Sequence, residues 1–219
     1  MSTADPNIEA FIEAAKQVSH LIASDQVAAA WRQPSAVDLM TVGALAGHLL
    51  LIVRRVGKRA EVAAAVGSVG FEPGNSAGAG LGWTWLRVEN PTDLDQPTHR
   101  QVRHEADIVA RWGWAAVRDS YSERVKQVEA LLHRSSLRST EVAGTSLTFS
   151  AYLATRVVEL LVHADDLACS VGLESPAPAA GMDVAIQTMV DAARSIHGDL
   201  PVLRHLTRRE RAAASISVF

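Results

Sequence analysis

The segment at residues 148–171 constrains the fold more than any other part of the sequence, because it shows two distinct faces of one helix. Its apolar side chains share one arc at three- and four-residue spacing: Leu153, Val157, Leu160, Ala164 and Leu167. Its polar side chains occupy an adjoining arc of roughly 100°: Tyr152, Thr155, Arg156, Glu159, His163 and Asp166. The segment is therefore predicted to be a core helix that carries one polar stripe.

Helical periodicity also marks other segments of the chain. Thr41 is a possible N-cap for a nearly all-apolar helix, and Gly172 is a natural C-cap for the helix that carries the stripe. A bend is expected near Gly113 in the third helix. The predicted helices besides 148–171 span residues 7–31, 41–66, 99–133 and 182–197.

The order of these segments predicts the fold class. No repeat of 20 to 50 residues and no extended alternation of apolar and polar residues occurs, so we expect an all-α fold. Four long helices would form a bundle, with short helices appended. The expected units are a bundle at residues 1–175 and a short helical extension at residues 176–219. Residues 67–98 are rich in Gly and Pro and are predicted to form a long loop around Trp83 and Trp85.

The composition limits the possible partners. Hydrophobic residues make up 48% and charged residues 21% of the 219 residues, and the net charge is −3. The scattered Lys and Arg residues predict binding neither to nucleic acid nor to an anionic membrane. The longest apolar run, about 15 residues, is too short to span a bilayer comfortably. Small molecules or proteins are the expected partners.

The single cysteine, Cys169, excludes an internal disulfide framework. The polar, acidic N-terminus lacks the basic and apolar regions of a signal peptide. Both features predict a cytoplasmic protein. Cys169 lies off the polar stripe by helical angle, so we expect a buried structural thiol rather than a nucleophile.

The polar stripe contains a possible metal site. Glu159 and His163 are four residues apart, which places their Cβ atoms about 6 Å from each other on one helix face. His48 is the only strongly polar side chain between Thr41 and Arg54, within a helix that must be buried. If the two helices are neighbours, two nitrogens and one carboxylate converge. That ligand set is used for catalytic zinc, with a fourth position left open.

Other interpretations of these residues remain open. His48 can be a core histidine with a hydrogen-bond partner, and Glu159 and His163 can form a buried polar network with Arg156. A cation at the site would offset the cost of burying the carboxylate. The sequence lacks the H-E-x-x-H zinc-protease pattern, the paired Glu-x-x-His motifs of di-iron bundles, the G-x-S-x-G elbow and the phosphate loop.

Three phrases in the sequence carry a resemblance to a known family: "AVDLMTVGALAGHLL", "DLDQPTHRQVRHEADIVARWG" and "FSAYLATRVVELLVHADDLACSVGL". They resemble the mycothiol-dependent maleylpyruvate isomerase family, part of the DinB/YfiT-like metalloenzyme superfamily. The resemblance covers roughly residues 8 to 175 and implies a DinB-like four-helix bundle. That family has a separate C-terminal domain after the bundle, whereas about 45 residues follow it here, so the resemblance does not carry over the substrate.

The resemblance implies a function for the polar stripe. It assigns zinc to His48, Glu159 and His163, with mycothiol as the thiol cofactor. A free thiol with a pKa near 8.5 is mostly protonated at pH 7, and zinc coordination deprotonates it. The expected enzyme is a transferase or isomerase in which the thiolate attacks a small electrophile. Arg156 would bind a substrate carboxylate or the cofactor, or would pair with Glu159 or Asp166. The alternative is a non-catalytic DinB-like module that binds a metal or a small ligand.

Overall fold

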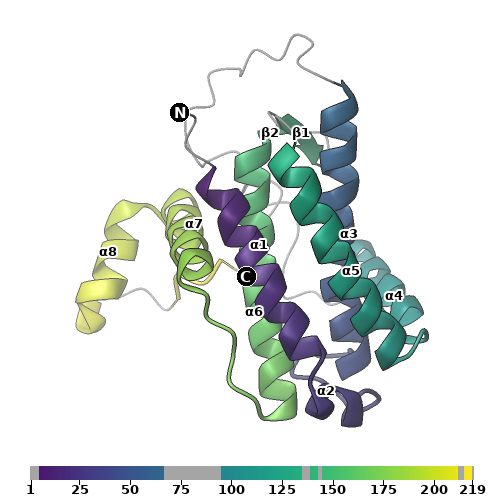
Figure 1. The fold of residues 1–219 in the computed structure, drawn as a ribbon. Helices are drawn as coiled ribbons and strands as arrows, with labels where there is room; N and C mark the ends of the chain where they lie inside the picture. Colours follow the sequence, from purple (N-terminus) through teal and green to yellow (C-terminus); the bar gives the residue numbers. More distant parts are fainter. Residues whose placement is uncertain (1–4, 67–94, 135–138, 143–144, 212–214, 219) are drawn as a thin grey trace.

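Four long helices form the body of the protein in the computed structural model (Figure 1). They are α1 (Pro6–Ile22), α3 (Val42–Val66), α5 (Trp114–Arg134) and α6 (Phe149–Val171). Around the bundle the order is α1, α6, α3, α5, so that each helix packs against two of the others. The predicted all-α bundle is confirmed. The structure describes residues 5–66, 95–134, 139–142, 145–211 and 215–218.

The bundle encloses one apolar core. Its largest fully buried side chains come from all four helices and include Phe11, Leu45, Leu49, Tyr121 and Leu153. The apolar arc predicted for the 148–171 segment is buried as expected, since Leu153, Val157, Leu160, Ala164 and Leu167 are each fully excluded from solvent. The hydrophobic effect therefore fixes the rotation of α6 about its own axis.

Capping residues determine where several of the helices begin and end. The Thr41 hydroxyl accepts a hydrogen bond from the Ala44 amide at 3.1 Å, and the Thr148 hydroxyl accepts one from the Ala151 amide at 3.1 Å. Each bond satisfies an amide that the first turn of a helix leaves without a partner. Gly172 ends α6 in the left-handed conformation, at φ 69°, so its predicted role as a C-cap is confirmed.

The prediction of one helix over residues 7–31 is wrong at its C-terminal part. The chain forms α1 and then a separate short helix, α2 (Asp25–Ala29). Ser24 separates them because its hydroxyl accepts a hydrogen bond from the Val27 amide and caps the new helix. Helical periodicity continues across the break, and so it did not reveal the break.

The predicted helix 99–133 is also two helices rather than one bent helix. α4 (Pro97–Ala110) ends before a turn at Gly113, whose φ of 84° is strained for other residues, and α5 begins directly after it. α4 packs against α3 instead of extending α5. This packing is close at Gly47, where an added Cβ would lie 2.8 Å from the Ala106 carbonyl oxygen.

A short hairpin precedes α6, although we expected no strands. β1 (Ser139–Val142) pairs antiparallel with β2 (Thr145–Thr148), and Ser139 lies opposite Thr148. Each strand has only four residues, too few to show a clear alternation of apolar and polar positions. The hairpin leads the chain directly into the N-terminus of α6.

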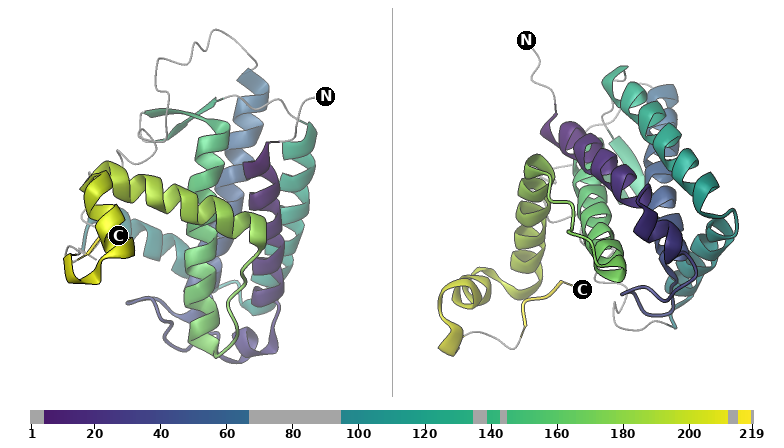
Figure 2. Two further views of the ribbon diagram at one scale, coloured as in Figure 1. Left: turned by 90° about the vertical axis from the view of Figure 1, so that its left-hand side faces the viewer. Right: turned by 60° about the horizontal axis from the view of Figure 1, so that its bottom comes forward.

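The C-terminal part is helical as predicted. α7 (Ala179–His197) begins slightly before the expected position and packs against α1 and α6 on the outside of the bundle (Figure 2). α8 (Asp199–Thr207) packs against α7, and a turn of 3₁₀ helix, η1 (Arg209–Arg211), follows. The division of the chain at residue 175 stays a prediction.

Two further expectations concern particular parts of the chain. Most of the predicted 67–98 loop, with Trp83 and Trp85, lies outside the described residues. Within the described residues, every helix is too short or too polar to cross a membrane.

Tyr121 provides a test of the core. Its hydroxyl is fully buried, burial raises its pKa well above the ordinary value, and it has no hydrogen-bond partner among the described residues. Because a buried polar group without a partner costs free energy, Tyr121→Phe is expected to raise the free energy of unfolding by about 1 kcal/mol. Urea denaturation measures this change. Tyr152→Phe is the control, and equal stabilisation in both variants would contradict the explanation.

Candidate metal site

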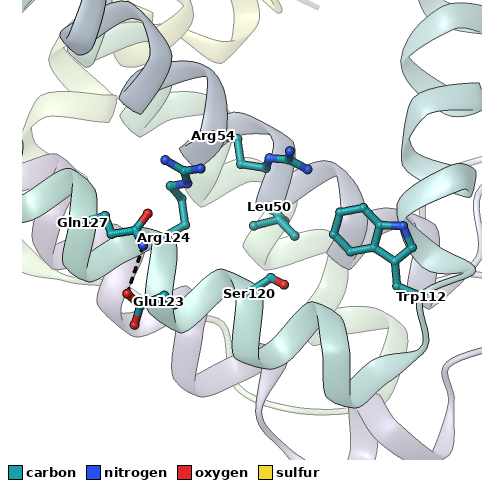
Figure 3. A pocket seen from close by; sticks show the side chains of 7 residues that line it. All are labelled: Leu50, Arg54, Trp112, Ser120, Glu123, Arg124 and Gln127. Carbon is teal, nitrogen blue, oxygen red and sulfur yellow. Dashed lines mark hydrogen bonds between the residues drawn. The ribbon is translucent and has the colours of Figure 1, made fainter.

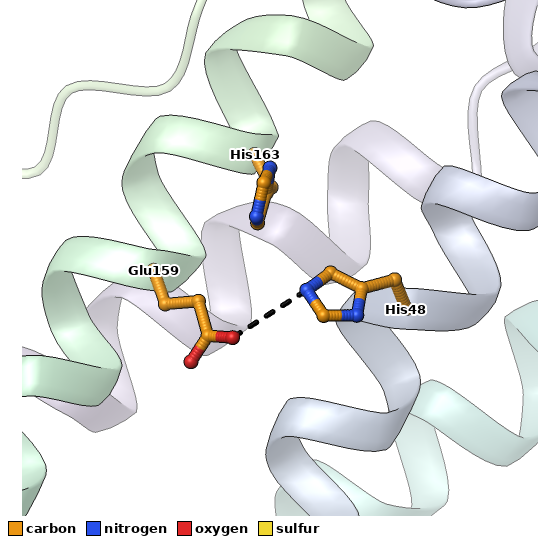
Figure 4. Close-up of side chains that lie close together, drawn as sticks. All are labelled: His48, Glu159 and His163. Atoms are coloured by element: carbon orange, nitrogen blue, oxygen red, sulfur yellow. Dashed lines mark ion pairs between the residues drawn. The ribbon is translucent and has the colours of Figure 1, made fainter. Parts of the chain in front are cut away.

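The three side chains singled out in the sequence meet between α3 and α6 (Figure 4). His48 projects from α3, while Glu159 and His163 project from α6 one turn apart. The Nε2 atom of His48 lies 3.5 Å from Oε1 of Glu159, and the two imidazole rings are 4.8 Å apart between centroids at an interplanar angle of 83°. One ligand atom from each residue lies within 4.8 Å of the others.

This arrangement depends on how the two helices pack. α3 and α6 are neighbours in the bundle, as the sequence analysis required. His48 is buried, whereas the side chain of Glu159 is 23% exposed. The cluster therefore lies at the edge of the core, where His48 is buried and Glu159 is partly in contact with solvent.

Arg156 lies against Glu159 and determines its charge state. Burial raises the pKa of Glu159, but Arg156, together with His48 and His163, more than offsets this and holds the pKa at about 2. The Arg156 guanidinium contacts the Oε2 atom of Glu159. Of the two pairings considered for Arg156, the structure contains the one with Glu159. At neutral pH the carboxylate is ionised.

His48 is in the opposite situation. Burial lowers its pKa below the ordinary value, and the neighbouring Glu159 only partly offsets this. His48 is therefore a neutral imidazole at neutral pH. A neutral imidazole next to an ionised carboxylate is the protonation state that metal coordination requires.

His163 is oriented by a residue to which the sequence analysis gave no role of its own. Its Nδ1 atom lies 3.0 Å from the Oδ2 atom of Asp166. Metal-bound histidines usually donate their second ring N–H to a carboxylate, which fixes the tautomer and the ring orientation. Nε2 of His163 then remains for a ligand. The i, i+3 spacing on the polar stripe was the available signal.

A second arginine adjoins the site from α3. The guanidinium carbons of Arg59 and Arg156 lie 5.3 Å and 5.4 Å from the centre of the Tyr152 ring. The sequence analysis missed Arg59, although it lies eleven residues, or about three helical turns, after His48 and so on the same face. Positive charge therefore extends along the face that contains the cluster.

Cys169 lies apart from this face, as expected, but it is exposed rather than buried. The prediction of a buried structural thiol is wrong. The reason is its position on α6: the neighbouring Leu167 and Ala168 face the core, and Cys169 falls on the outer side.

The donor set fits a zinc ion. Two imidazoles and one ionised carboxylate from facing helices can bind zinc and leave one position open. The anionic ligand also suits a divalent cation, which would offset the cost of keeping a carboxylate in this interface. The fold and the cluster together define a helical bundle with a metal-type ligand set on its inner face.

Comparison with solved structures supports the bundle fold. No model of a known protein family matches the sequence, and no curated protein matches it. The fold is similar to the crystal structure of the mycothiol-dependent maleylpyruvate isomerase, with a TM-score of 0.59 and 16% identity over 87% of this chain and 69% of that one. A histidine-to-alanine mutant of the mycothiol-dependent maleylpyruvate isomerase gives a TM-score of 0.55 and 16% identity, over 85% of this chain and 69% of that one. The likeness confirms the all-α bundle fold, and both structural neighbours are named as the isomerase whose family the sequence resembles.

The charge state of Glu159 can be tested through Arg156. Arg156→Gln removes the strongest influence that lowers the pKa of Glu159, so this pKa should rise from about 2. Carboxyl ¹³C NMR titration of protein freed of metal by a chelator measures the change. Arg59→Gln, which removes a positive charge beside the Tyr152 ring, should have a much smaller effect.

The same substitution changes how stability depends on pH. A carboxylate with a lowered pKa contributes stability above its ordinary pKa of about 4.5, and this contribution is lost as the pH falls toward 2. In Arg156→Gln the loss should be complete at a higher pH. Identical pH profiles of unfolding for the wild type and the variant would show that Arg156 does not hold Glu159 ionised.

Proposed function

We propose that the protein is a zinc-dependent enzyme that uses mycothiol as a thiol cofactor, and that it acts as a transferase or isomerase on a small electrophile. The supporting observation is the convergence of His48, Glu159 and His163 between α3 and α6. The structural neighbours are named as mycothiol-dependent isomerases, which supports the choice of thiol. We further propose that the protein acts in the cytoplasm.

The chain's own residues have separate parts in this proposal. His48, Glu159 and His163 hold the zinc ion, and Asp166 orients His163 through its Nδ1 atom. Arg156 keeps Glu159 ionised and ready to bind the cation. Zinc, when bound, lowers the pKa of a coordinated thiol, so that it is a nucleophile at neutral pH.

Arg156 is also the proposed catalytic residue. Its guanidinium lies between Glu159 and the ring of Tyr152, next to the ligand cluster. A substrate carboxylate or a polar group of the cofactor would bind to this cation, because guanidinium groups bind oxyanions strongly. The protein supplies no thiol to the cluster, since its single cysteine lies elsewhere on α6.

Metal analysis tests the site itself. We expect about one zinc ion per chain, and a loss of most of this metal in His48→Ala, Glu159→Ala and His163→Ala. Asp166→Ala should weaken metal binding about 10- to 100-fold, because the His163 ring remains but is no longer held in its orientation. His104→Ala, which changes an exposed histidine on α4, is the matched control. Full metal content in all three ligand variants would refute the metal site.

Thiol binding distinguishes the enzyme from the alternative, a non-catalytic binding module. Cobalt-substituted protein titrated with mycothiol should develop a sulfur-to-metal charge-transfer band, and conversion of an electrophile should require both thiol and metal. Cys169→Ser should behave like the wild type, because Cys169 lies away from the cluster. Metal binding without the band or any thiol-dependent reaction would favour the binding module.

A further inference from the structure

A cavity open to solvent lies on the opposite side of α3 from the metal-type cluster. Leu50 follows His48 by two residues, which rotates it by about 200° around the helix, away from α6 and toward α5. The cavity has a volume of about 250 Å³. Its lining comes from α3, from α5 and from the turn between α4 and α5 (Figure 3): Leu50, Arg54, Trp112, Ser120, Glu123, Arg124 and Gln127.

Two arginines give this cavity its charge. Arg54 places its guanidinium carbon 5.6 Å from the centre of the Trp112 ring, and no carboxylate pairs with it among the described residues. Arg124 has only a long contact of 3.9 Å to Glu61, which lies outside the lining. Arg54 lies between Arg124 and Trp112 in Figure 3.

The protein contains a comparable pair that is already neutralised. The guanidinium carbon of Arg118 lies 4.6 Å from the centre of the Trp114 ring, but Asp119 also pairs with this arginine at 2.8 Å. That pair does not line the cavity. Among the described residues, an arginine therefore lies against a tryptophan twice. The arginine that lines the cavity, Arg54, is the one without a carboxylate partner. Arg54 is exposed and has no carboxylate partner among the described residues, so an anion from solution can reach it.

The remaining polar side chains are compatible with an anion. Glu123 is the one acidic residue of the lining, and the Gln127 amide donates a hydrogen bond to it at 2.9 Å. With two arginines and one glutamate the lining has a net charge of +1. The Ser120 hydroxyl can donate one more hydrogen bond.

We propose that this cavity binds a small organic carboxylate with a flat apolar body. Arg54 and Arg124 would hold the carboxylate, because guanidinium groups match its geometry with paired hydrogen bonds. The half-exposed ring of Trp112 would contact the apolar body, while Leu50 is fully buried behind the cavity wall. The cavity is smaller than the pockets of about 300–1,000 Å³ that hold drug-sized ligands, so the ligand is a compact one.

Benzoate is the probe for this site. Titration of the metal-loaded protein should give a saturable shift of the Trp112 indole resonance in ¹H–¹⁵N NMR, with Trp112→Phe used to assign the signal. Arg54→Gln and Arg124→Gln should each weaken binding at least tenfold. Arg118→Gln is the matched control, since it removes an arginine from the same kind of pair outside the cavity, and it should leave benzoate binding unchanged.

Two further measurements separate this site from the metal-type cluster and from simple anion binding. His48→Ala should bind benzoate at Trp112 as the wild type does, even if the proposed zinc function fails. Acetate and inorganic phosphate should bind at least tenfold more weakly than benzoate, because they have no apolar body. The absence of a saturable shift, unchanged affinity in both cavity variants, loss of the shift in His48→Ala, or phosphate binding as tight as benzoate would each overturn the proposal.

Discussion

The packing of α3 against α6 has to accommodate an ionised carboxylate, Glu159, between two mostly apolar helices. An unpaired carboxylate in such a place would be costly, because water solvates it only in part. Here Arg156 contacts Glu159 and keeps its pKa at about 2, and two imidazoles lie next to it. These neighbours make the polar cluster tolerable in the interface between α3 and α6. A metal cation would compensate the same charge more completely.

The two histidines of the cluster are held in different ways. Asp166 fixes His163 through its Nδ1 atom, so α6 supplies both a ligand and its support. Nδ1 of His48 has no hydrogen-bond partner among the described residues. The position of His48 depends on packing and on the contact of its Nε2 atom with Glu159. The residue before it is Gly47, where α4 approaches α3 too closely for a Cβ. α4 thus contributes to the site without providing a ligand to the cluster.

The central position of α3 gives it two faces that carry polar side chains. His48 and Arg59 lie toward α6, while Leu50 and Arg54 lie toward α5. The helix can present polar groups on both sides because most of its other positions between Val42 and Val56 are apolar and buried in the bundle. The metal-type cluster and the cavity beside Trp112 are consequently separated by the thickness of one helix.

Much of the fold and the candidate ligand set could be predicted from the sequence, because helical periodicity relates residues that are close together in the chain. The spacing of Glu159 and His163 sets their proximity on one helix, and the cap residues Thr41 and Gly172 mark two helix ends. Periodicity could not show the break at Ser24, where a side-chain cap decides, or the hairpin of two four-residue strands. Both depend on individual hydrogen bonds rather than on a repeating pattern.

What the sequence determined by itself was which residues share a helix face, since 3.6 residues per turn leave little choice. Only the tertiary structure decided which faces meet. It placed α3 beside α6, so that His48 reaches Glu159, and it paired Arg156 with Glu159 but Asp166 with His163. It also brought Trp112 to Arg54 across 58 residues of chain. Such contacts result from packing of the whole core, which no local pattern in the sequence records.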